Sequence, residues 1–206
     1  MADPPLQGAQ ATRRREDALD GPRGLGAEAR EAAGESGADW PDRIFDVLME
    51  QEVRQVAYVP DGGHARLIRR LHAEPSVRAV PLTTEEEGVA LLAGAWLGGQ
   101  RGALLMQSSG VGNCVNMLSL VRLCRIPLLM LVTMRGEWGE FNPWQVPMGS
   151  TTKAALELMD MRVLRAERPE EVGEVVSAAA RMAYGGGTPM AVLLAQRLIG
   201  AKVFVK

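Results

Sequence analysis

Short apolar runs that alternate with helical segments dominate the sequence from Trp40 onward. These runs are rich in Val, Leu, Met and Ala, which is typical of buried strands. Because strands separated by helices are joined by right-handed crossovers, the pattern predicts a mostly parallel sheet covered by helices on both faces. We therefore expect an α/β, three-layer αβα domain whose sheet has six strands. The expected strands are residues 56–59, 79–82, 102–107, 127–133, 162–166 and 190–195.

Helical patterns fill the intervals between the apolar runs. Pro169 stands where the first turn of a helix tolerates proline, and Gly185 stands where a helix commonly ends. We expect "SSGVGN" at 108–113 to form a turn, and Ser150 or Thr151 to cap a helix. The expected helices are residues 41–53, 64–73, 85–98, 112–124, 151–159 and 169–184. Ligands of such folds bind at the carboxyl ends of the strands, so the turns that follow the strands are the places to search for a site.

Residues 1–39 have a different composition from the rest of the chain. They are rich in Gly, Ala, Pro, Arg and Glu and contain few large apolar residues. Such a segment buries too little apolar surface to offset the entropy lost on ordering. The sequence therefore predicts a disordered N-terminal tail over 1–39, followed by a single domain over 40–206.

The composition excludes several classes of function. A net charge of −2 and a pI near 5.8 provide no basic surface for nucleic acid or an anionic membrane. The longest apolar run, "IPLLMLVTM" at 126–134, is too short to span a bilayer. The two cysteines, Cys114 and Cys124, form no CxxC motif, so we expect no metal site and place both thiols in the core on one face of a helix. We expect a cytoplasmic protein.

Three adjacent carboxylates open the helix expected at 85–98, in the stretch "TTEEEGVALLAG". At about 100° per residue, Glu85 and Glu86 fall at the edges of an apolar stripe and Glu87 points away from it. Acids in a first helical turn complement the macrodipole, each by about 0.3–1 kcal/mol, and this accounts well for Glu87. A carboxylate directed toward the buried side needs a partner or a proton, because its desolvation is costly. The residues of the expected stripe are Val89, Leu92, Ala93, Trp96 and Leu97.

Three segments in order carry a family resemblance: "EEEGVALLAGAW", "LLMQSSGVGNCVN" and "MRGEWGEFNPWQVPMGS". Over about residues 42–200 the chain resembles the pyrimidine-binding domain of thiamine-diphosphate-dependent decarboxylases. Within that family it is most similar to the alpha subunit of sulfopyruvate decarboxylase and to phosphonopyruvate decarboxylase. Counted back from "AGAW", the family's conserved acid corresponds to Glu86. The resemblance implies that Glu86 hydrogen-bonds the cofactor's aminopyrimidine and promotes loss of the thiazolium proton, with Glu85 as the alternative.

The same resemblance assigns further residues. Gln107, Ser108, Ser109 and Gly110 would line the cofactor site, with Gln107 also near the substrate. A glycine-rich turn between strand and helix is, by itself, more often a packing feature, and this one lacks the Lys-Ser/Thr ending of a phosphate loop.

Three other residues are candidates for binding the substrate. Asp61 and His64 belong to "VPDGGH", in which Gly62 stands where relatives usually have serine. The alternative for His64 is a histidine that merely opens a surface helix. Arg135 suits a carboxylate, sulfonate or phosphonate, and the alternative is a surface ion pair with Glu137 or Glu140.

The chain lacks the "GDG" motif with which thiamine diphosphate enzymes hold Mg²⁺ and the diphosphate. The resemblance therefore implies a separate beta subunit that carries that half, in a hetero-oligomer of at least two chains of each kind. The expected reaction is decarboxylation of a short 2-oxo acid. The preferred substrate is 3-sulfopyruvate, which would give sulfoacetaldehyde and CO₂. Phosphonopyruvate, another 2-oxo acid, and a non-catalytic interaction module of the same fold are the alternatives.

Overall fold

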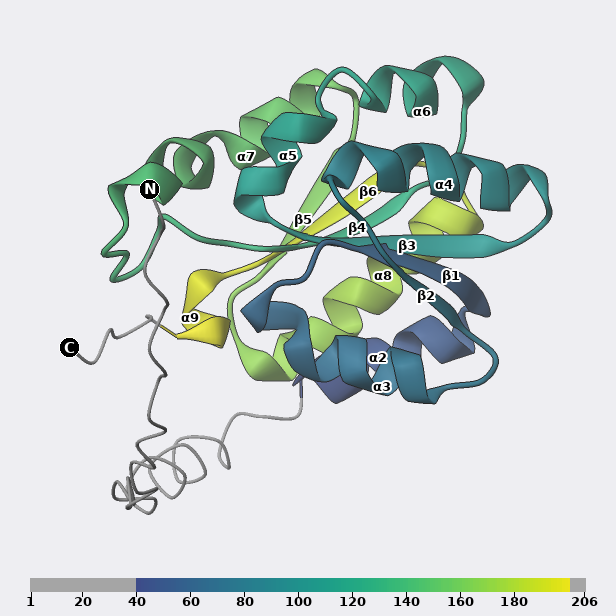
Figure 1. Cartoon of the computed structure of the whole chain (residues 1–206), viewed down its shortest axis with the longest axis horizontal. Coiled ribbons are helices and arrows are strands. Elements are labelled where there is room, and N and C mark those ends of the chain that lie inside the picture. The colour runs from purple at the N-terminus through teal and green to yellow at the C-terminus, as the bar shows by residue number, and fades with distance from the viewer. Residues whose placement is uncertain (1–39, 201–206) are drawn as a thin grey trace, which may run out of the picture. The chain divides into compact units, whose positions relative to one another are not determined.

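The computed structural model describes residues 40–200, and these contain one six-stranded sheet (Figure 1). Every strand pair is parallel, in the order β2-β1-β3-β4-β6-β5, which confirms the predicted sheet. The predicted N-terminal tail lies outside the described residues. The strands are β1 (Val53–Tyr58), β2 (Arg78–Pro81), β3 (Arg101–Gln107), β4 (Leu129–Thr133), β5 (Arg162–Ala166) and β6 (Met190–Leu194).

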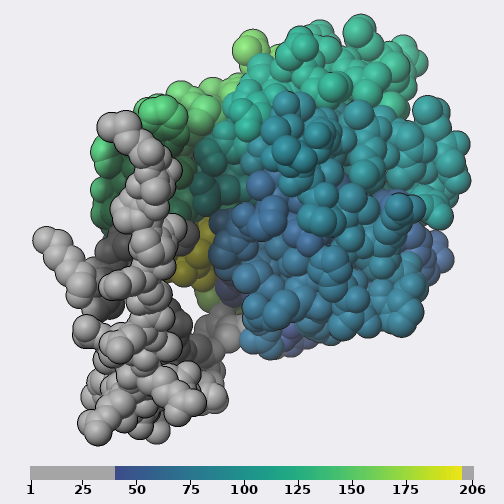
Figure 2. Space-filling model, in the orientation of Figure 1, coloured from purple at the N-terminus to yellow at the C-terminus, as the bar shows by residue number. Residues whose placement is uncertain are grey.

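Helices cover both faces of this sheet, as the crossovers require (Figure 1). One face carries α2 (Trp40–Glu50), α3 (Ala65–Ala73) and α8 (Val172–Tyr184). The opposite face carries α4 (Glu85–Leu97), α5 (Ser108–Cys114), α6 (Leu118–Cys124) and α7 (Val146–Leu158). Short helices complete the described chain: η1 (Gly62–His64), η2 (Pro143–Gln145), η3 (Pro169–Glu171) and α9 (Gln196–Ile199). In the space-filling view, the purple-to-teal segments form most of the visible face (Figure 2).

The central strands are buried on both sides, which explains their continuous apolar sequence. Side chains of a strand alternate between the two faces, so neighbouring residues enter different halves of the core. Leu105 and Leu131, which are register partners, pack toward α2, α3 and α8, whereas Leu104 and Met130 pack toward the other helices. Full burial of each such side chain contributes roughly 1.5–3 kcal/mol.

The strand order brings the candidate residues to one edge of the sheet. From β1 the chain passes to β2 on one side and then to β3 on the other, so the direction of winding reverses between β1 and β3. Ligands of parallel sheets bind outside the carboxyl ends of the strands at such a reversal. The residues that follow β1, β3 and β4 therefore meet at this edge.

The apolar stripe predicted for α4 is wrong in its last turn. Val89, Leu92 and Ala93 are buried, but Leu97 is 82 % exposed. Leu92 already lies over Gly102, where a Cβ would collide with its Cδ2. Because Gly102 is near the start of β3 and α4 runs back along that strand, one further turn carries the helix beyond the sheet.

The segment after β3 also differs from its prediction. "SSGVGN" is helical from Ser108 instead of forming a turn, and a break after Cys114 separates α5 from α6. The break changes the helical phase, so the two thiols do not share a face. Cys114 is buried as predicted, whereas Cys124 is exposed.

Two helices have bounds that differ from the prediction. Helix α7 begins at Val146, because Asn142 Oδ1 accepts a hydrogen bond from Trp144 N and starts η2 directly before it. Ser150 and Thr151 therefore lie within the helix instead of capping it, and their hydroxyls donate to Pro147 O. The first helix is also shorter than predicted, because β1 begins at residue 53.

Two helical glycines allow a matched test of how the segment after β4 is packed. A Cβ on Gly149 of α7 would collide with the carbonyl oxygen of Arg135, whereas a Cβ on Gly94 of α4 would meet nothing within 4 Å. Gly149→Ala should lower the free energy of unfolding by roughly 1–3 kcal/mol or more. Gly94→Ala should raise it by about 0.5–1 kcal/mol, because alanine favours the helix. Urea denaturation of both variants measures the difference, and equal effects would contradict this packing.

Candidate active site

Asp61 joins the carboxyl ends of β1, β3 and β4. It follows β1, and its Oδ1 accepts a hydrogen bond of 3.1 Å from Nε2 of Gln107, the last residue of β3. Its Oδ2 accepts from the hydroxyl of Thr133, the last residue of β4, at 2.6 Å and from Gly63 N at 3.1 Å. Hydrogen bonds to an ionised acceptor are stronger than neutral ones. The carboxylate therefore holds three strand ends in one arrangement.

The Asp61 carboxylate also sets the direction of the hydrogen bonds toward Ser109. An ionised carboxylate only accepts, so Gln107 must present its amide nitrogen to Asp61 and its Oε1 elsewhere. Ser109 Oγ donates to that Oε1 at 3.0 Å. Because a hydroxyl has a single proton, Ser109 then offers only lone pairs to a ligand.

His64, near Asp61, is fully buried. It is therefore not the surface histidine that the sequence left as an alternative. Its Nε2 lies 3.1 Å from Leu131 O, and because a carbonyl oxygen only accepts, Nε2 carries the proton. Nδ1 is buried without a hydrogen-bond partner among the described residues. Burial lowers the pKa of His64, and the nearby charge of Asp61 only partly opposes this effect. The ring is therefore neutral.

The three glutamates of α4 occupy three different environments. Glu85 is buried, and its Oε2 accepts a hydrogen bond of 2.8 Å from Asn113 Nδ2 of α5. Glu86 is half-buried, and its Oε2 is fully buried without a hydrogen-bond partner among residues 40–200. Glu87 is exposed and accepts from Thr83 N, as an acid at a helix start is expected to do. Of the three, only Glu86 presents a buried acceptor that lacks a donor.

Glu85 is closely packed against α5, and Glu86 lies near the same helix. A Cβ on Gly110 would collide with the Glu85 carboxyl group, so only glycine allows α5 to approach α4 at this point. Burial raises the pKa of the adjacent Cys114 thiol to about 12, with a further contribution from the charges of Glu85 and Glu86. Both acids are therefore close enough to the buried face of α5 to influence the Cys114 thiol.

Arg135 follows β4 closely and is buried in an ion pair. Its Nε and Nη2 each donate to the Glu140 carboxylate at 2.6 Å, so the pairing is bidentate. The backbone N–H of Arg135 donates to Ser108 Oγ at 3.1 Å, which connects this loop to the first residue of α5. Glu140 was one of the two partners that the sequence suggested, but the pair is interior instead of superficial, with side chains 7 % and 3 % exposed.

Gln196 was not singled out from the sequence. It lies two residues after the end of β6, is almost fully buried, and hydrogen-bonds Glu140 as well as the backbone of Glu137 and Trp138. The signal that could have identified it is its position, because a polar residue just after a buried parallel strand lies at the edge where ligands bind.

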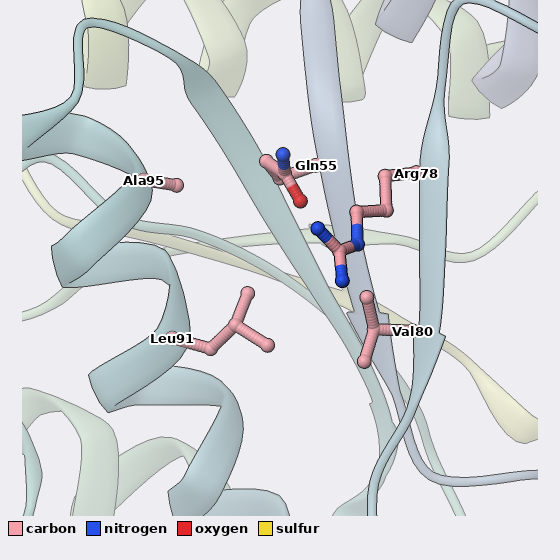
Figure 3. Close-up of a pocket in the computed structure, with 5 residues that line it drawn as sticks. All are labelled: Gln55, Arg78, Val80, Leu91 and Ala95. Carbon is pink, nitrogen blue, oxygen red and sulfur yellow. The ribbon is translucent and has the colours of Figure 1, made fainter.

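Two pockets of the described residues are lined by neither Glu85 nor Glu86. One of about 280 Å³ lies between α4 and the strands β1 and β2 (Figure 3). Its lining residues are Gln55, Arg78, Val80, Leu91 and Ala95. Another, of about 330 Å³, adjoins the carboxyl ends of β5 and β6 and is lined by Glu137, Trp138, Arg165, Glu167, Ala195 and Arg197.

Two further features were searched for over residues 40–200. No group of three or more His, Cys, Asp or Glu side chains in this range is arranged to hold a metal ion. No helix in the same range has both the length and the apolar character that crossing a bilayer requires.

A family model described as "Thiamine pyrophosphate enzyme, N-terminal TPP binding domain" matches residues 39–153. The alpha subunit of sulfopyruvate decarboxylase from Methanococcus maripaludis is 32 % identical over 154 residues, which cover 74 % of this chain and 92 % of that protein. Its counterpart from Methanothermobacter thermautotrophicus is 39 % identical over 157 residues, covering 76 % of this chain and 95 % of that protein.

Two other proteins are matched over only part of their length. Phosphonopyruvate decarboxylase from Streptomyces viridochromogenes is 42 % identical over 111 residues, which cover 53 % of this chain and 28 % of that protein. Among solved structures, 2-oxoglutarate:ferredoxin oxidoreductase from Magnetococcus marinus superposes with a TM-score of 0.59 at 13 % identity, covering 77 % of this chain and 29 % of that one. This last similarity concerns the fold alone.

Neutral His64 should make the fold sensitive to mild acid. The pKa of His64 is lowered in the folded chain, so below its ordinary value of about 6.5 the unfolded chain binds one more proton than the folded chain. The free energy of unfolding should then fall as pH decreases from about 6.5, by up to about 1.4 kcal/mol per pH unit. His64→Asn should be less stable at pH 7 but lack this slope. Denaturant titrations of both proteins between pH 5 and 7.5 test it, and parallel curves would contradict a neutral buried imidazole.

Proposed function

Because the chain belongs to the thiamine pyrophosphate enzymes through their N-terminal TPP-binding domain, we propose that it is the alpha subunit of a two-chain 2-oxo acid decarboxylase. The favoured reaction converts 3-sulfopyruvate to sulfoacetaldehyde and CO₂. The chain covers 92–95 % of two separate alpha subunits that bear the name sulfopyruvate decarboxylase, but only 28 % of a phosphonopyruvate decarboxylase. That difference in coverage supports a split enzyme over a single-chain one.

The observation that carries this proposal is the unpartnered buried oxygen of Glu86. A buried acceptor without a donor costs free energy, so it is retained where a ligand supplies the donor. A protonated ring nitrogen of the cofactor's aminopyrimidine fits this requirement. When bound, thiamine diphosphate would supply a nucleophilic thiazolium carbon for the 2-oxo group and a cationic ring that takes up the electron pair released when CO₂ leaves. The part of Glu86 is to share a proton with the ring nitrogen in a site that excludes water.

Glu85 is a weaker candidate for this proton transfer. Asn113 already donates to its Oε2, and Gly110 packs directly against its carboxyl group. We assign Glu85 to holding α5 against α4, which places Gln107, Ser108 and Ser109 at the site. In this assignment Ser109 accepts a hydrogen bond from a donor on the cofactor or substrate, as its orientation toward Gln107 requires.

The substrate side of the site would be formed by Asp61, Gln107 and Arg135. Asp61 fixes the amide of Gln107, and fully buried His64 supports this network from below without direct contact with the substrate. Arg135 is proposed to bind the second anionic group of the substrate. Two of its guanidinium nitrogens are engaged by Glu140, and Nη1 makes no hydrogen bond within the described residues.

The partner chain is proposed to hold the diphosphate and Mg²⁺, in an assembly with at least two chains of each kind. A docking surface for it is suggested by the loop after β4 and the start of α7, where large apolar side chains are exposed. Exposed aromatic residues clustered at one edge of a fold mark interaction sites. The exposed apolar side chains of this surface are Trp138, Phe141, Trp144 and Val146, of which Trp144 is the most exposed at 83 %.

Glu86→Gln in the co-expressed complex tests the chemistry. Glutamine keeps the volume but removes the ionisable group, so decarboxylation of 3-sulfopyruvate should fall by about 10²–10⁴-fold while the two chains still co-purify. Glu87→Gln, a matched change of an exposed acid on the same turn, should retain activity within about twofold. A substrate panel with phosphonopyruvate and pyruvate decides the preferred acid.

The other outcomes are informative as well. Wild-type activity in Glu86→Gln would exclude this role, and loss in Glu85→Gln alone would transfer it to Glu85. A wild-type complex that assembles but decarboxylates no 2-oxo acid would indicate a non-catalytic interaction module.

Trp144→Ala tests the docking surface. Removal of an exposed aromatic anchor from an interface typically costs about 2 kcal/mol or more, so the dissociation constant of the two chains should rise at least about tenfold. Leu158→Ala is the matched control, because Leu158 is 73 % exposed on the same helix as Val146 but at its other end. Analytical ultracentrifugation of both complexes gives the comparison. Equal weakening, or none, would contradict docking through the loop after β4.

A further inference from the structure

Gln196 connects the end of β6 to the loop that carries Arg135. Its side chain is 1 % exposed. Oε1 accepts two hydrogen bonds of 2.9 Å from the backbone N–H groups of Glu137 and Trp138. Nε2 donates to Glu140 Oε2 at 3.0 Å. Because two N–H donors face one end of the amide and a carboxylate faces the other, the amide can be oriented in only one way.

Glu140 receives an unusual number of donors. Besides Gln196, they are Arg135 Nε and Nη2 and the backbone N–H groups of Gly136 and Asn142, the last two at 3.3 and 3.0 Å. Arg135 and these other donors lower the pKa of Glu140 to about 2, so the carboxylate is ionised at any physiological pH. Glu140 therefore holds the guanidinium from one side while Gln196 holds Glu140.

The pairing has a consequence for anion binding. Glu140 cancels much of the charge of Arg135, so a substrate anion is attracted weakly by charge alone. What remains is a directional contact with Nη1, the guanidinium nitrogen that Glu140 does not engage. Recognition then depends on where the guanidinium plane is held, and small displacements of such a group can be costly.

We infer that Gln196 is a positioning residue for recognition of the substrate's second anionic group. It acts by fixing Glu140, which in turn fixes the guanidinium of Arg135. This inference rests on the proposed function, because it assigns the anion to Arg135. It distinguishes substrates by their second charge: a 2-oxo acid that lacks one does not depend on Gln196.

Gln196→Glu is the decisive variant. It keeps Oε1 for the two backbone donors but replaces the Nε2 donor by a carboxylate oxygen that faces Glu140. When the introduced carboxyl is ionised it repels Glu140, and when it is protonated its O–H can donate to Glu140 as the amide did. In the co-expressed complex, the KM for 3-sulfopyruvate should rise about tenfold relative to wild type at pH 8.5 and return to within about threefold at pH 6. The kcat should change by less than about threefold, and the KM for pyruvate should stay unchanged.

Two control variants separate positioning from general damage. Gln196→Met removes the donor without adding an ionisable group, so its KM for 3-sulfopyruvate should be raised at both pH values. Gln100→Glu makes the same chemical change at an exposed glutamine before β3, at the opposite end of the sheet, and should leave both KM values unchanged.

Hydrogen exchange on the full chain provides a readout that needs no turnover. The amides of Glu137 and Trp138 are protected by Gln196 Oε1, so Gln196→Met should speed their exchange at least about tenfold, while Gln196→Glu should not. A wild-type complex without decarboxylase activity would overturn the proposed function, and this exchange result would still show whether Gln196 holds the loop.

Each of four results would overturn the inference. The first is a KM of Gln196→Glu for 3-sulfopyruvate that stays within twofold of wild type at pH 8.5, and the second is a KM that is raised equally at pH 6. The third is a KM for pyruvate that rises in parallel with that for 3-sulfopyruvate, which would mean a purely structural role. Unchanged exchange of the Glu137 and Trp138 amides in Gln196→Met would exclude the clamp itself.

Discussion

The hydrogen bonds of one carboxylate determine how the edge of this sheet is arranged. Asp61 accepts from Gln107 and Thr133, so the ends of three parallel strands share a single anionic acceptor. Parallel strands supply no direct link between their ends, because each is followed by a separate crossover. With Asp61 in place, the orientation of the Gln107 amide and of the Ser109 hydroxyl follows from the rules of donors and acceptors.

Adjacent residues of the same type have different roles because the helix directs them to different surroundings. Glu85 contacts α5 and is hydrogen-bonded by Asn113, Glu87 is exposed to solvent, and Glu86 keeps one buried oxygen that has no donor within residues 40–200. A free carboxylate oxygen in an apolar site is costly, and a ligand that donates a proton there recovers that cost. We propose that this unsatisfied oxygen of Glu86 connects the fold to the chemistry of thiamine diphosphate.

Near Arg135, the buried positive charge is compensated by a paired carboxylate. Arg135 is buried, and a buried unpaired guanidinium would be strongly unfavourable, so Glu140 accompanies it. Glu140 in turn is stabilised by the Gln196 amide at the end of β6. The loop after β4 is thereby attached to a neighbouring strand, while its aromatic side chains remain exposed at the surface proposed for the partner chain.

Much of the fold was predictable from the residues alone. Six apolar runs separated by helical segments require a parallel sheet covered on both faces, and the structure has that sheet. The predictions failed where helix ends depend on distant contacts. Leu97 is exposed because Leu92 already covers the start of β3, and α7 begins early because Asn142 starts η2. Local periodicity contains neither fact.

The sequence by itself determined the architecture and the identity of the acidic cluster, because periodicity and composition are properties of the chain and need no partner. Only the tertiary structure decided how the three glutamates differ, that His64 is buried and neutral, and that Gln196 and Glu140 hold Arg135. These depend on contacts between β1, β4, β6 and α5, which lie far apart along the chain. Burial and hydrogen-bond partners arise only when the strands are brought together.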